Sequence, residues 1–271
     1  MEINGQELAK EIINELKKER EKYDDLKIAA FLIGETEEKN KFLNMKKKVA
    51  EELNIELRIY KINPDWSRRK IRKYISQVIK KKTLHGGIVQ LPLPEKLPQQ
   101  YILNSIPPEK DIDCLSVKNL GKYFANQFLI RPPSVEVVDF LAKKYEFKFD
   151  GTIVVIVGYG NLIGKPLTHY FCYKKATTIV INENTIDAER YFHQADYIIS
   201  GAGVPLLITT CKKGAVIIDF GIKVIENKIF GDVDITAIKD KAKLYTPTPG
   251  GTGPLLTAML FKNFFSLLKC Q

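Results

Sequence analysis

The sequence predicts an α/β protein of two domains, each built around a parallel sheet. Strand-like and helix-like segments alternate along most of the chain, as they do where crossover helices join parallel strands. An irregular segment, 107–133, separates two such blocks. We expect one domain over residues 1–134 together with 251–271, and the other over residues 135–250.

The first block contains three strands with helices between them. Its strands are short apolar runs bounded by turn residues, and its helices carry apolar residues at a spacing of three and four. The strands are predicted over 28–33, 55–59 and 87–90, and the helices over 8–16, 39–53 and 69–81. Pro92 and Pro94 stop the last strand, because proline cannot donate a ladder hydrogen bond.

The second block follows a predicted helix over 136–145 and opens with the fully apolar strand 152–157. Further strands are predicted over 178–181, 197–199 and 215–219, each beside a helix candidate. The block closes near residues 247–251. An apolar helix over 255–268 ends the chain, and we expect it to pack back on the first domain.

The composition is that of a globular protein, with 45% hydrophobic and 27% charged residues. No apolar run approaches the roughly 18–20 residues that span a bilayer, and residues 1–5 do not resemble a secretory signal. The four cysteines lie far apart and lack metal-ligand spacing. We therefore expect a cytoplasmic protein with no membrane partner and no metal site.

The net charge of +10 has three possible explanations: a nucleic-acid partner, an anionic small substrate, or solvated helix faces rich in lysine. The basic residues occur in short runs such as Lys46-Lys47-Lys48 and Lys80-Lys81-Lys82, rather than in one basic arm. This distribution favours solvated helix faces. We expect no nucleic-acid partner.

A glycine-rich turn follows the strand 152–157. Its sequence is Gly158-Tyr159-Gly160-Asn161-Leu162-Ile163-Gly164, and a helix opens after it. Glycines let the backbone approach a diphosphate, and a helix N-terminus favours an anion. The spacing is GxGxxxG rather than the commoner GxGxxG, so a purely structural turn is the alternative. Its strand–turn–helix context favours a Rossmann-like nucleotide-binding domain.

The next strand ends close to Glu183. In dinucleotide sites, an acidic residue at the end of this strand bonds the ribose 2′-hydroxyl and repels a 2′-phosphate. Glu183 lies somewhat beyond the usual spacing of ~20 residues from the glycines, and the alternative is a solvated loop glutamate.

Several ordered segments are more specific than the glycine turn. They are VQLPLP at 89–94, PEKDID at 108–113, GAVIIDFG at 214–221, GDVD at 231–234 and PGGTGPLLT at 249–257. Together they resemble the methylenetetrahydrofolate dehydrogenase/methenyltetrahydrofolate cyclohydrolase family, in the family's order over nearly the whole chain. The resemblance implies oxidation of 5,10-methylenetetrahydrofolate with NAD(P), hydrolysis of the methenyl product to 10-formyltetrahydrofolate, and a homodimer.

The resemblance also implies the catalytic residues Lys46, Gln90 and Asp113. The family motif YxxxK is matched by Phe42 to Lys46, so the lysine is present and the tyrosine is replaced. Residues four apart share a helix face, and Phe42 can stack on the folate but cannot donate the tyrosine's hydrogen bond. Gln90 is expected to bond the lysine and substrate, Asp113 to bind the pterin, and Asp111 to be structural.

Further contacts follow from the same resemblance. The expected substrate contacts are Phe42, Val89, Leu91, Pro92, Pro249, Gly250 and Gly251. The expected cofactor contacts are Gly158, Tyr159, Gly160, Ile163, Gly164, Asn182, Glu183, Thr185, Gly201, Ala202, Gly203, Gly221 and Gly253.

The chain departs from the family pattern at four places. The family's GRS turn is GYG at 158–160, and its HSxT segment is NENT at 182–185. Both changes remove features expected to favour a 2′-phosphate, so the cofactor is expected to be NADP or NAD, with NAD favoured. Cys114 stands where the family has glycine, and residues 130–133 replace PCTP.

Other functions stay open at this stage. The departures from the pattern are compatible with a dehydrogenase that lacks the hydrolase activity, or with a degenerate family member. An unrelated nicotinamide dehydrogenase would explain the glycine turn alone. A basic nucleic-acid-binding protein would explain the charge alone, and it predicts salt-sensitive retention on heparin.

Overall fold

The computed structural model describes residues 1–226 and 228–270. The chain divides into two compact units, each with its own parallel sheet. Unit 1 consists of Met1–Ala9 and Ser134–Leu256, and unit 2 consists of Lys10–Pro133 and Thr257–Gln271. The two-domain α/β fold class is confirmed, whereas the exact domain boundaries expected from the sequence stay a prediction.

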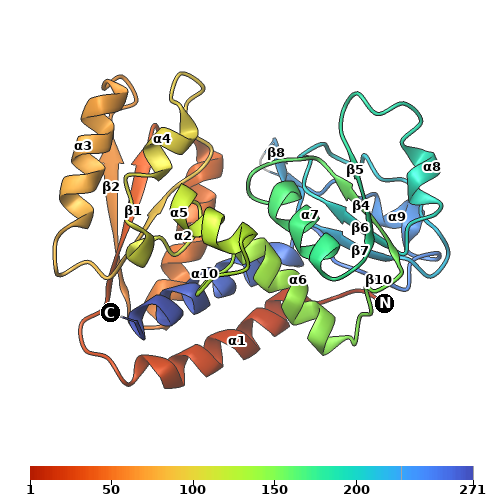
Figure 1. Cartoon of the computed structure of the whole chain (residues 1–271), viewed down its shortest axis with the longest axis horizontal. Coiled ribbons are helices and arrows are strands. Elements are labelled where there is room, and N and C mark those ends of the chain that lie inside the picture. The colour runs from red at the N-terminus through yellow and green to blue at the C-terminus, as the bar shows by residue number, and fades with distance from the viewer. Residues whose placement is uncertain (227, 271) are drawn as a thin grey trace. The chain divides into compact units, whose positions relative to one another are not determined.

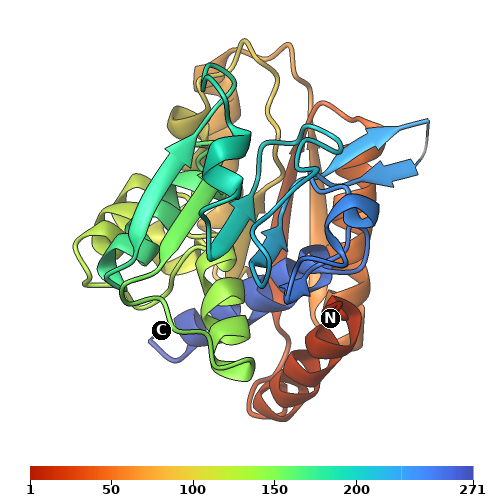
Figure 2. The ribbon, with the colours of Figure 1, turned by 90° about the vertical axis from the view of Figure 1, so that its right-hand side faces the viewer.

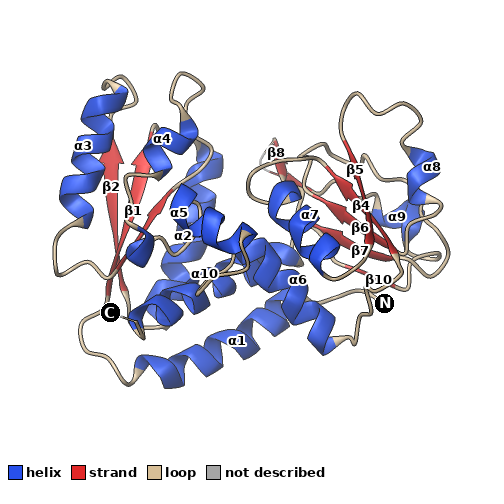
Figure 3. Ribbon diagram, viewed as in Figure 1, coloured by secondary structure: helices blue, strands red, loops and turns tan. Residues whose placement is uncertain are grey.

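Unit 2 is built on a three-stranded parallel sheet in the order β2-β1-β3 (Figures 1 and 3). The strands are β1 (Lys27–Ile33), β2 (Glu56–Ile62) and β3 (Gly86–Val89). Residues 28–33 of the central strand are all buried, which explains their continuous apolar run. The helices that connect and flank these strands are α2 (Glu37–Glu52), α3 (Arg68–Ile79), α4 (Gln99–Leu103) and α5 (Val117–Phe124), with the 3-10 turn η1 (Pro108–Lys110).

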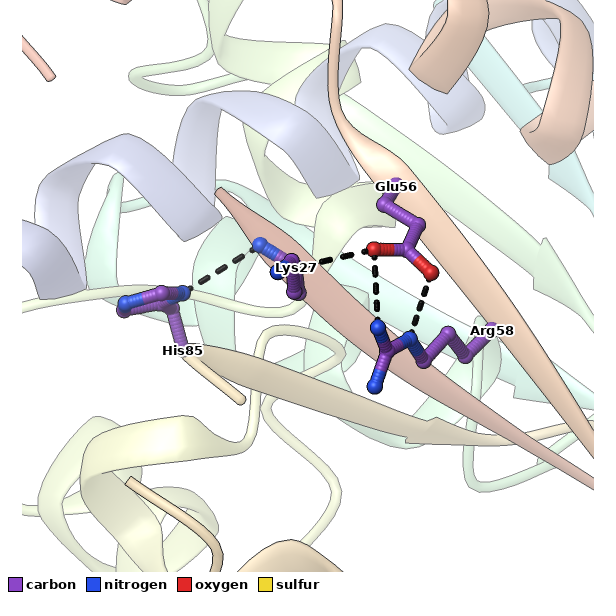
Figure 4. Close-up of polar contacts among 4 residues, drawn as sticks. All are labelled: Lys27, Glu56, Arg58 and His85. Carbon is purple, nitrogen blue, oxygen red and sulfur yellow. Dashed lines mark hydrogen bonds and ion pairs between the residues drawn. The ribbon is translucent and has the colours of Figure 1, made fainter. Parts of the chain in front are cut away.

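Polar contacts connect the strands of this sheet at their amino-terminal ends, as Figure 4 shows. Lys27 donates its backbone N–H to His85 Nδ1 (3.2 Å), and its Nζ lies 3.8 Å from Glu56 Oε2. Arg58 donates to both oxygens of Glu56. Burial, together with the charges of Lys110 and Lys27, lowers the pKa of His85. The ring is therefore neutral, as its role as an acceptor requires.

Unit 1 contains a five-stranded parallel sheet in the order β10-β7-β6-β4-β5. The strands are β4 (Ile153–Val157), β5 (Thr177–Ile181), β6 (Tyr197–Ser200), β7 (Val216–Asp219) and β10 (Leu244–Tyr245). The chain runs outward from β4 to β5 and then returns to β6 on the other side of β4. In open α/β sheets, ligands bind at the carboxyl ends of the two strands that flank such a reversal, which are β4 and β6 here.

Shorter elements complete unit 1. The helices are α6 (Pro133–Lys144), α7 (Gly164–Tyr173), α8 (Glu189–Phe192) and α9 (Ile235–Ile238). The strands β8 (Lys223–Ile225) and β9 (Lys228–Phe230) pair antiparallel in a separate ribbon, light blue in Figure 2.

Two helices connect the units in sequence. Helix α1 (Gly5–Arg20) begins in unit 1, and α10 (Thr252–Leu268) ends in unit 2. In unit 2, Asn263 of α10 donates to the carbonyls of Ile112 (3.1 Å) and Arg131 (2.8 Å). The prediction that the final helix packs on the first domain is confirmed. No helix in the described part of the chain has the length and apolar character needed to cross a membrane.

One local expectation was wrong, and one feature was not predicted. The segment 107–133, expected to be irregular, contains α5, because Ser116 caps the helix by accepting from Asn119 N and Asp111 holds the preceding turn. The β8–β9 ribbon was not predicted, because its strands have only three residues each.

Candidate active site

Unit 2 brings together the three residues expected to be catalytic. Lys46 lies on α2, Gln90 directly follows β3, and Asp113 follows the η1 turn. Lys46 Nζ donates to Gln90 Oε1 (2.8 Å), and Gln90 Nε2 donates to the carbonyl of Leu91 (2.7 Å). These two bonds fix the amide orientation, so Gln90 presents its oxygen to the lysine.

Burial and charge act in opposite directions on this cluster. Desolvation lowers the pKa of Lys46, and the carboxylate of Asp113 partly offsets that effect. Desolvation likewise raises the pKa of Asp113, and Lys46 partly offsets it. Each charge therefore stabilises the other, while burial favours the neutral amine and the neutral acid. A lowered pKa increases the fraction of the amine that is neutral and can accept a proton.

The expected folate contacts of unit 2 lie beside this cluster in the sequence. Phe42 is half-buried one turn before Lys46 on α2. Val89 is buried at the end of β3, and Leu91 and Pro92 follow Gln90 through a cis Leu91–Pro92 peptide bond. A solvent-accessible aromatic ring one helical turn from the lysine has the geometry to lie on the same side as its ammonium.

Asp111 has the structural surroundings expected of it. Its carboxylate accepts from the backbone N–H groups of Leu115 (3.2 Å) and Ser116 (2.7 Å) and from Asn119 Nδ2 (3.1 Å). It thereby holds the turn that carries Asp113. Cys114, which follows Asp113, is fully buried and has a φ of 57°. This left-handed conformation favours glycine, the residue that the family pattern has at this position.

In unit 1 the glycine turn meets the turn after β6. Gly158 has a φ of 92° and donates to the carbonyl of Ile181 at the end of β5 (2.9 Å). A Cβ on Gly158 would lie 3.2 Å from Ala202 Cα, and a Cβ on Gly164 would lie 2.1 Å from the carbonyl oxygen of Gly158. Glycine is needed at 164 because the first turn of α7 packs directly on this loop.

This turn fits a dinucleotide. A Cβ on Gly160 would meet nothing within 4 Å, so its backbone faces open space beside the ten-residue helix α7. Backbone N–H groups at such a helix start favour a diphosphate. Tyr159 is exposed next to Gly160. A glycine turn that is open at Gly160 and is followed by a helix start is the arrangement that binds the diphosphate of a nicotinamide dinucleotide.

The other expected nucleotide contacts occupy turns of unit 1. Asn182 and Glu183 are exposed in the turn after β5, and Asn182 N donates to Oγ1 of half-buried Thr185 (3.0 Å). Ile163 packs on Gly201, since a Cβ added to Gly201 would lie 2.7 Å from the Ile163 side chain. Ala202 and Gly203 follow β6, Gly221 follows β7, and Gly253 lies in the first turn of α10.

The loop with Pro249, Gly250 and Gly251 also belongs to unit 1. The Thr248–Pro249 peptide bond is cis, and Gly250 has a φ of 101°. Gly251 N donates to the carbonyl of Pro247 (2.8 Å), which closes the loop. These three residues, expected to contact folate, are therefore assigned to a different unit from Lys46.

Two buried carboxylates of unit 1 were not assigned a role from the sequence. Asp219 ends β7 and Asp232 lies in the GDVD segment, and each is 1% exposed. Their hydrogen bonds reach the turn after β6 and the 246–252 loop. Among the residues that the structure describes, no group of three His, Cys, Asp or Glu residues is placed to hold a metal ion.

A parallel sheet with a glycine cradle at its switch point, together with a desolvated lysine–amide–carboxylate cluster, defines a nucleotide-dependent enzyme of the α/β class. Two family models match the chain. Residues 3–113 match the catalytic domain of tetrahydrofolate dehydrogenase/cyclohydrolase, and residues 132–271 match its NAD(P)-binding domain. The chain belongs to the tetrahydrofolate dehydrogenase/cyclohydrolase family. It is an NAD(P)-dependent oxidoreductase and a hydrolase of one-carbon folate metabolism.

Relatives and solved structures agree with this assignment. The bifunctional protein FolD of Aquifex aeolicus is 35% identical, with 96% of this chain and 92% of the relative covered. The crystal structure of the Campylobacter jejuni enzyme superposes with a TM-score of 0.93 at 31% identity, over 100% and 99% of the two chains. The Trypanosoma brucei enzyme, solved with NADP and an inhibitor, gives a TM-score of 0.93 at 26% identity, over 100% and 97%.

Proposed function

We propose that this chain oxidises 5,10-methylenetetrahydrofolate to 5,10-methenyltetrahydrofolate, with NAD preferred to NADP, and hydrolyses the product to 10-formyltetrahydrofolate. We further propose that Lys46, Gln90 and Asp113 carry the residue-level chemistry. The observation that supports this most is the 2.8 Å bond from Lys46 Nζ to Gln90 Oε1, with Asp113 acting electrostatically on the same ammonium.

The dehydrogenase step needs positioning more than proton transfer. The folate methylene carbon loses a hydride, and the cation that forms is stabilised by its own two nitrogens. When bound, the nicotinamide ring supplies the hydride acceptor. The two oxygens of Asp113 can accept two adjacent pterin N–H groups, and the ring of Phe42 can stack on the folate. Orientation of this kind can supply several kcal/mol of catalysis.

The cyclohydrolase step needs a base. Water attacks the methenyl carbon, and one of its protons must leave. Burial lowers the pKa of Lys46, so its neutral amine can take that proton while Gln90 holds the amine in place. The second proton of the water ends on the folate nitrogen released when the ring opens. The net products are 10-formyltetrahydrofolate and one proton.

The preference for NAD is supported by two exposed side chains at the nucleotide cradle. Tyr159 stands where a cationic residue would be expected to favour a 2′-phosphate, and it carries no charge. Glu183 lies in the turn after β5, and the end of that strand bonds the glycine turn through Gly158 N. A carboxylate there can bond the ribose 2′-hydroxyl and repel a 2′-phosphate.

Four further expectations complete the proposal. We propose a homodimer, a cytoplasmic location, the absence of a nucleic-acid or membrane partner, and two domains: a folate-binding domain over 1–134 with 251–271, and a nucleotide-binding domain over 135–250. Light scattering tests the dimer. Weak, salt-insensitive retention on heparin supports the absence of a nucleic-acid partner, whereas strong salt-sensitive retention contradicts it.

The test of the proposed function is steady-state oxidation of methylenetetrahydrofolate with NAD and NADP side by side, followed by the spectroscopic decay of the methenyl product. We expect turnover with both, an NAD preference above about tenfold, and enzyme-dependent methenyl decay. A preference for NADP would contradict the role of Glu183. The absence of turnover with either nucleotide would contradict the proposed activity.

A further inference from the structure

Lys39 is a buried lysine near the start of helix α2, outside the candidate catalytic cluster. It is 4% exposed. Its Nζ donates to the carbonyl oxygens of Ile33 and Gly34, each at 3.0 Å. These carbonyls lie at the carboxyl end of β1, the central strand of the unit 2 sheet. One ammonium therefore ties the first turn of α2 to this strand end.

The surroundings of Lys39 show what the ammonium acts on. Burying a charge is unfavourable unless hydrogen bonds compensate for the lost water. Desolvation lowers the pKa of Lys39, and the charge of Glu38 offsets part of that effect. The two carbonyl acceptors supply the hydrogen bonds, and the bond to Ile33 is itself buried. Because both bonds end on the backbone of one strand end, Lys39 acts on the placement of the chain.

Lys39 and Lys46 belong to one stripe of α2. The stripe consists of Lys39, Leu43, Lys46 and Ala50, which are four, three and four residues apart and therefore share a helix face. All of them except Lys46 are buried. Residues seven apart are separated by about two turns, or ~10 Å along the helix axis. The placement of the first turn thus determines where the ammonium of Lys46 lies, and Phe42 moves with it.

The strand that holds Lys39 also holds Gln90. Gln90 N donates to the carbonyl of Phe31 in β1 (2.9 Å), and Gln90 Oε1 accepts from Lys46 Nζ (2.8 Å). Lys39, β1, Gln90 and Lys46 are thus linked in a cycle of contacts that closes through α2. Both partners of the Lys46–Gln90 bond therefore depend on the same strand end for their position.

We propose that Lys39 is a positioning residue of the hydrolysis step: its ammonium sets the position of α2 on β1, so that Lys46 meets Gln90 and Phe42 meets the folate. The inference rests on the proposed function, in which Lys46 is the base and Phe42 stacks on the substrate. Loss of the ammonium lets the first turn of α2 shift on β1. A shift of about 1 Å can slow a positioned reaction by ~10²-fold.

Lys39→Met is the first test, because its side chain fills the space of the lysine stem and removes both bonds. Hydrolysis of methenyltetrahydrofolate should slow by about tenfold or more. The kcat of dehydrogenation should stay within about threefold, because the hydride step does not use the base. The folate KM should rise several-fold, and the nucleotide KM should not change. Partial unfolding would instead lower both maximal rates by one factor and leave every KM unchanged. That outcome, or unchanged hydrolysis, would overturn the proposal.

Two further variants test whether Lys39 acts through its donors and through Lys46. Lys39→Arg keeps a charged group with several N–H donors, so hydrolysis should stay within about threefold of wild type. This variant also tests the inference if Lys39→Met does not fold, and a tenfold loss in it would overturn the role of the donors. In Lys39→Met/Gln90→Leu, hydrolysis should be no slower than in Gln90→Leu alone, because both changes disturb one contact of Lys46. Additive losses would overturn the path through Lys46.

Two control variants separate the ammonium from the stability of α2. Lys48→Met replaces an exposed lysine of the same helix and should leave both rates and every KM unchanged. Thr36→Val removes the helix cap, since Thr36 Oγ1 accepts from Lys39 N (3.3 Å). Its melting temperature should fall, but the ratio of hydrolysis to dehydrogenation should not change while the ammonium keeps its bonds. A ratio that changes as much as in Lys39→Met would overturn the role of the ammonium.

Equilibrium binding of tetrahydrofolate, measured by calorimetry, tests the placement of Phe42 without turnover. Lys39→Met should bind several-fold more weakly than wild type, and Lys48→Met should bind as wild type does. Equal affinity in Lys39→Met and wild type would overturn the inference even if the enzyme is active. If binding depends on Lys39 in this way but the wild-type protein turns over no folate, the proposed function alone is refuted.

Discussion

Replacing Lys46 by methionine separates the two proposed reactions. The substitution keeps an unbranched apolar chain on α2 but removes the ammonium that bonds Gln90 Oε1 at 2.8 Å. Hydrolysis of methenyltetrahydrofolate should then lose the base, a contribution of about 10²–10⁴ in rate for a positioned proton acceptor. Dehydrogenation transfers a hydride and needs no base, so it should stay within about tenfold of wild type.

The structure also predicts how Lys46→Met affects Gln90 and Asp113. Gln90 is 4% exposed, and its oxygen would lose its donor, which costs about 1–3 kcal/mol for a buried acceptor. Removal of a desolvated ammonium offsets part of that cost. The pKa of Asp113 should rise further, because Lys46 no longer lowers it. Folate affinity in the variant should therefore decline more steeply than in wild type as the pH falls.

The assay is single-turnover decay of methenyltetrahydrofolate absorbance beside steady-state dehydrogenation, with Lys47→Met as the matched control. Lys47 is exposed on the same helix and lies 3.7 Å from Glu51, so its replacement should leave both rates unchanged. If Lys46→Met still accelerates methenyl decay, Lys46 is not the base of the hydrolysis. An equal loss of both activities would show that Lys46 positions the folate instead.

Three further outcomes are expected. The free energy of unfolding in urea should be about 1 kcal/mol higher for Cys114→Gly than for Cys114→Ala, because glycine adopts the left-handed backbone at a φ of 57° without strain. The reverse order would show that this backbone conformation is not strained. Glu183→Gln should raise the ratio of the kcat/KM for NADP to that for NAD by about tenfold or more, because the carboxylate no longer repels the 2′-phosphate. An unchanged ratio would show that Glu183 does not lie at the ribose. The pKa of Asp219 is raised from 3.8 to about 7, so stability from this group is lost as the pH rises through that interval. Melting temperatures at two pH values, one below and one above this interval, should thus differ less for Asp219→Asn than for wild type; equal differences would contradict the raised pKa.

The main strands and long helices could be predicted because their signals are local. A continuous apolar run such as 153–157 forms a strand in which four of the five residues are buried, and the structure moves most predicted boundaries by only one to three residues. Helix α5 could not be predicted in this way. It has eight residues with Gly121 inside, and its first turn depends on Asp111, which lies outside the helix.

The site depends on contacts that no local pattern contains. Lys46 and Gln90 are 44 residues apart, and without the family resemblance Lys46 would be one more lysine on a basic helix. The partners of Asp232 lie 28–32 residues away, at the end of β6 and in the turn after it. The sequence of the GDVD motif shows that an acid is present, but only the folded chain shows that its four donors come from that other segment.

Three desolvated acids of this chain are accommodated in different ways. Asp111 receives three donors and keeps a turn in place, the charge of half-buried Lys46 offsets part of the desolvation of Asp113, and burial together with the charge of Asp232 raises the pKa of Asp219 to about 7. Burying a carboxylate without such compensation would cost several kcal/mol. Burial raises the pKa of Asp111 and of Asp113 as well as that of Asp219. The pH dependence of the two reactions should therefore depend on which neighbouring charge is removed, because loss of Lys46 raises the pKa of Asp113 whereas loss of Asp232 lowers that of Asp219.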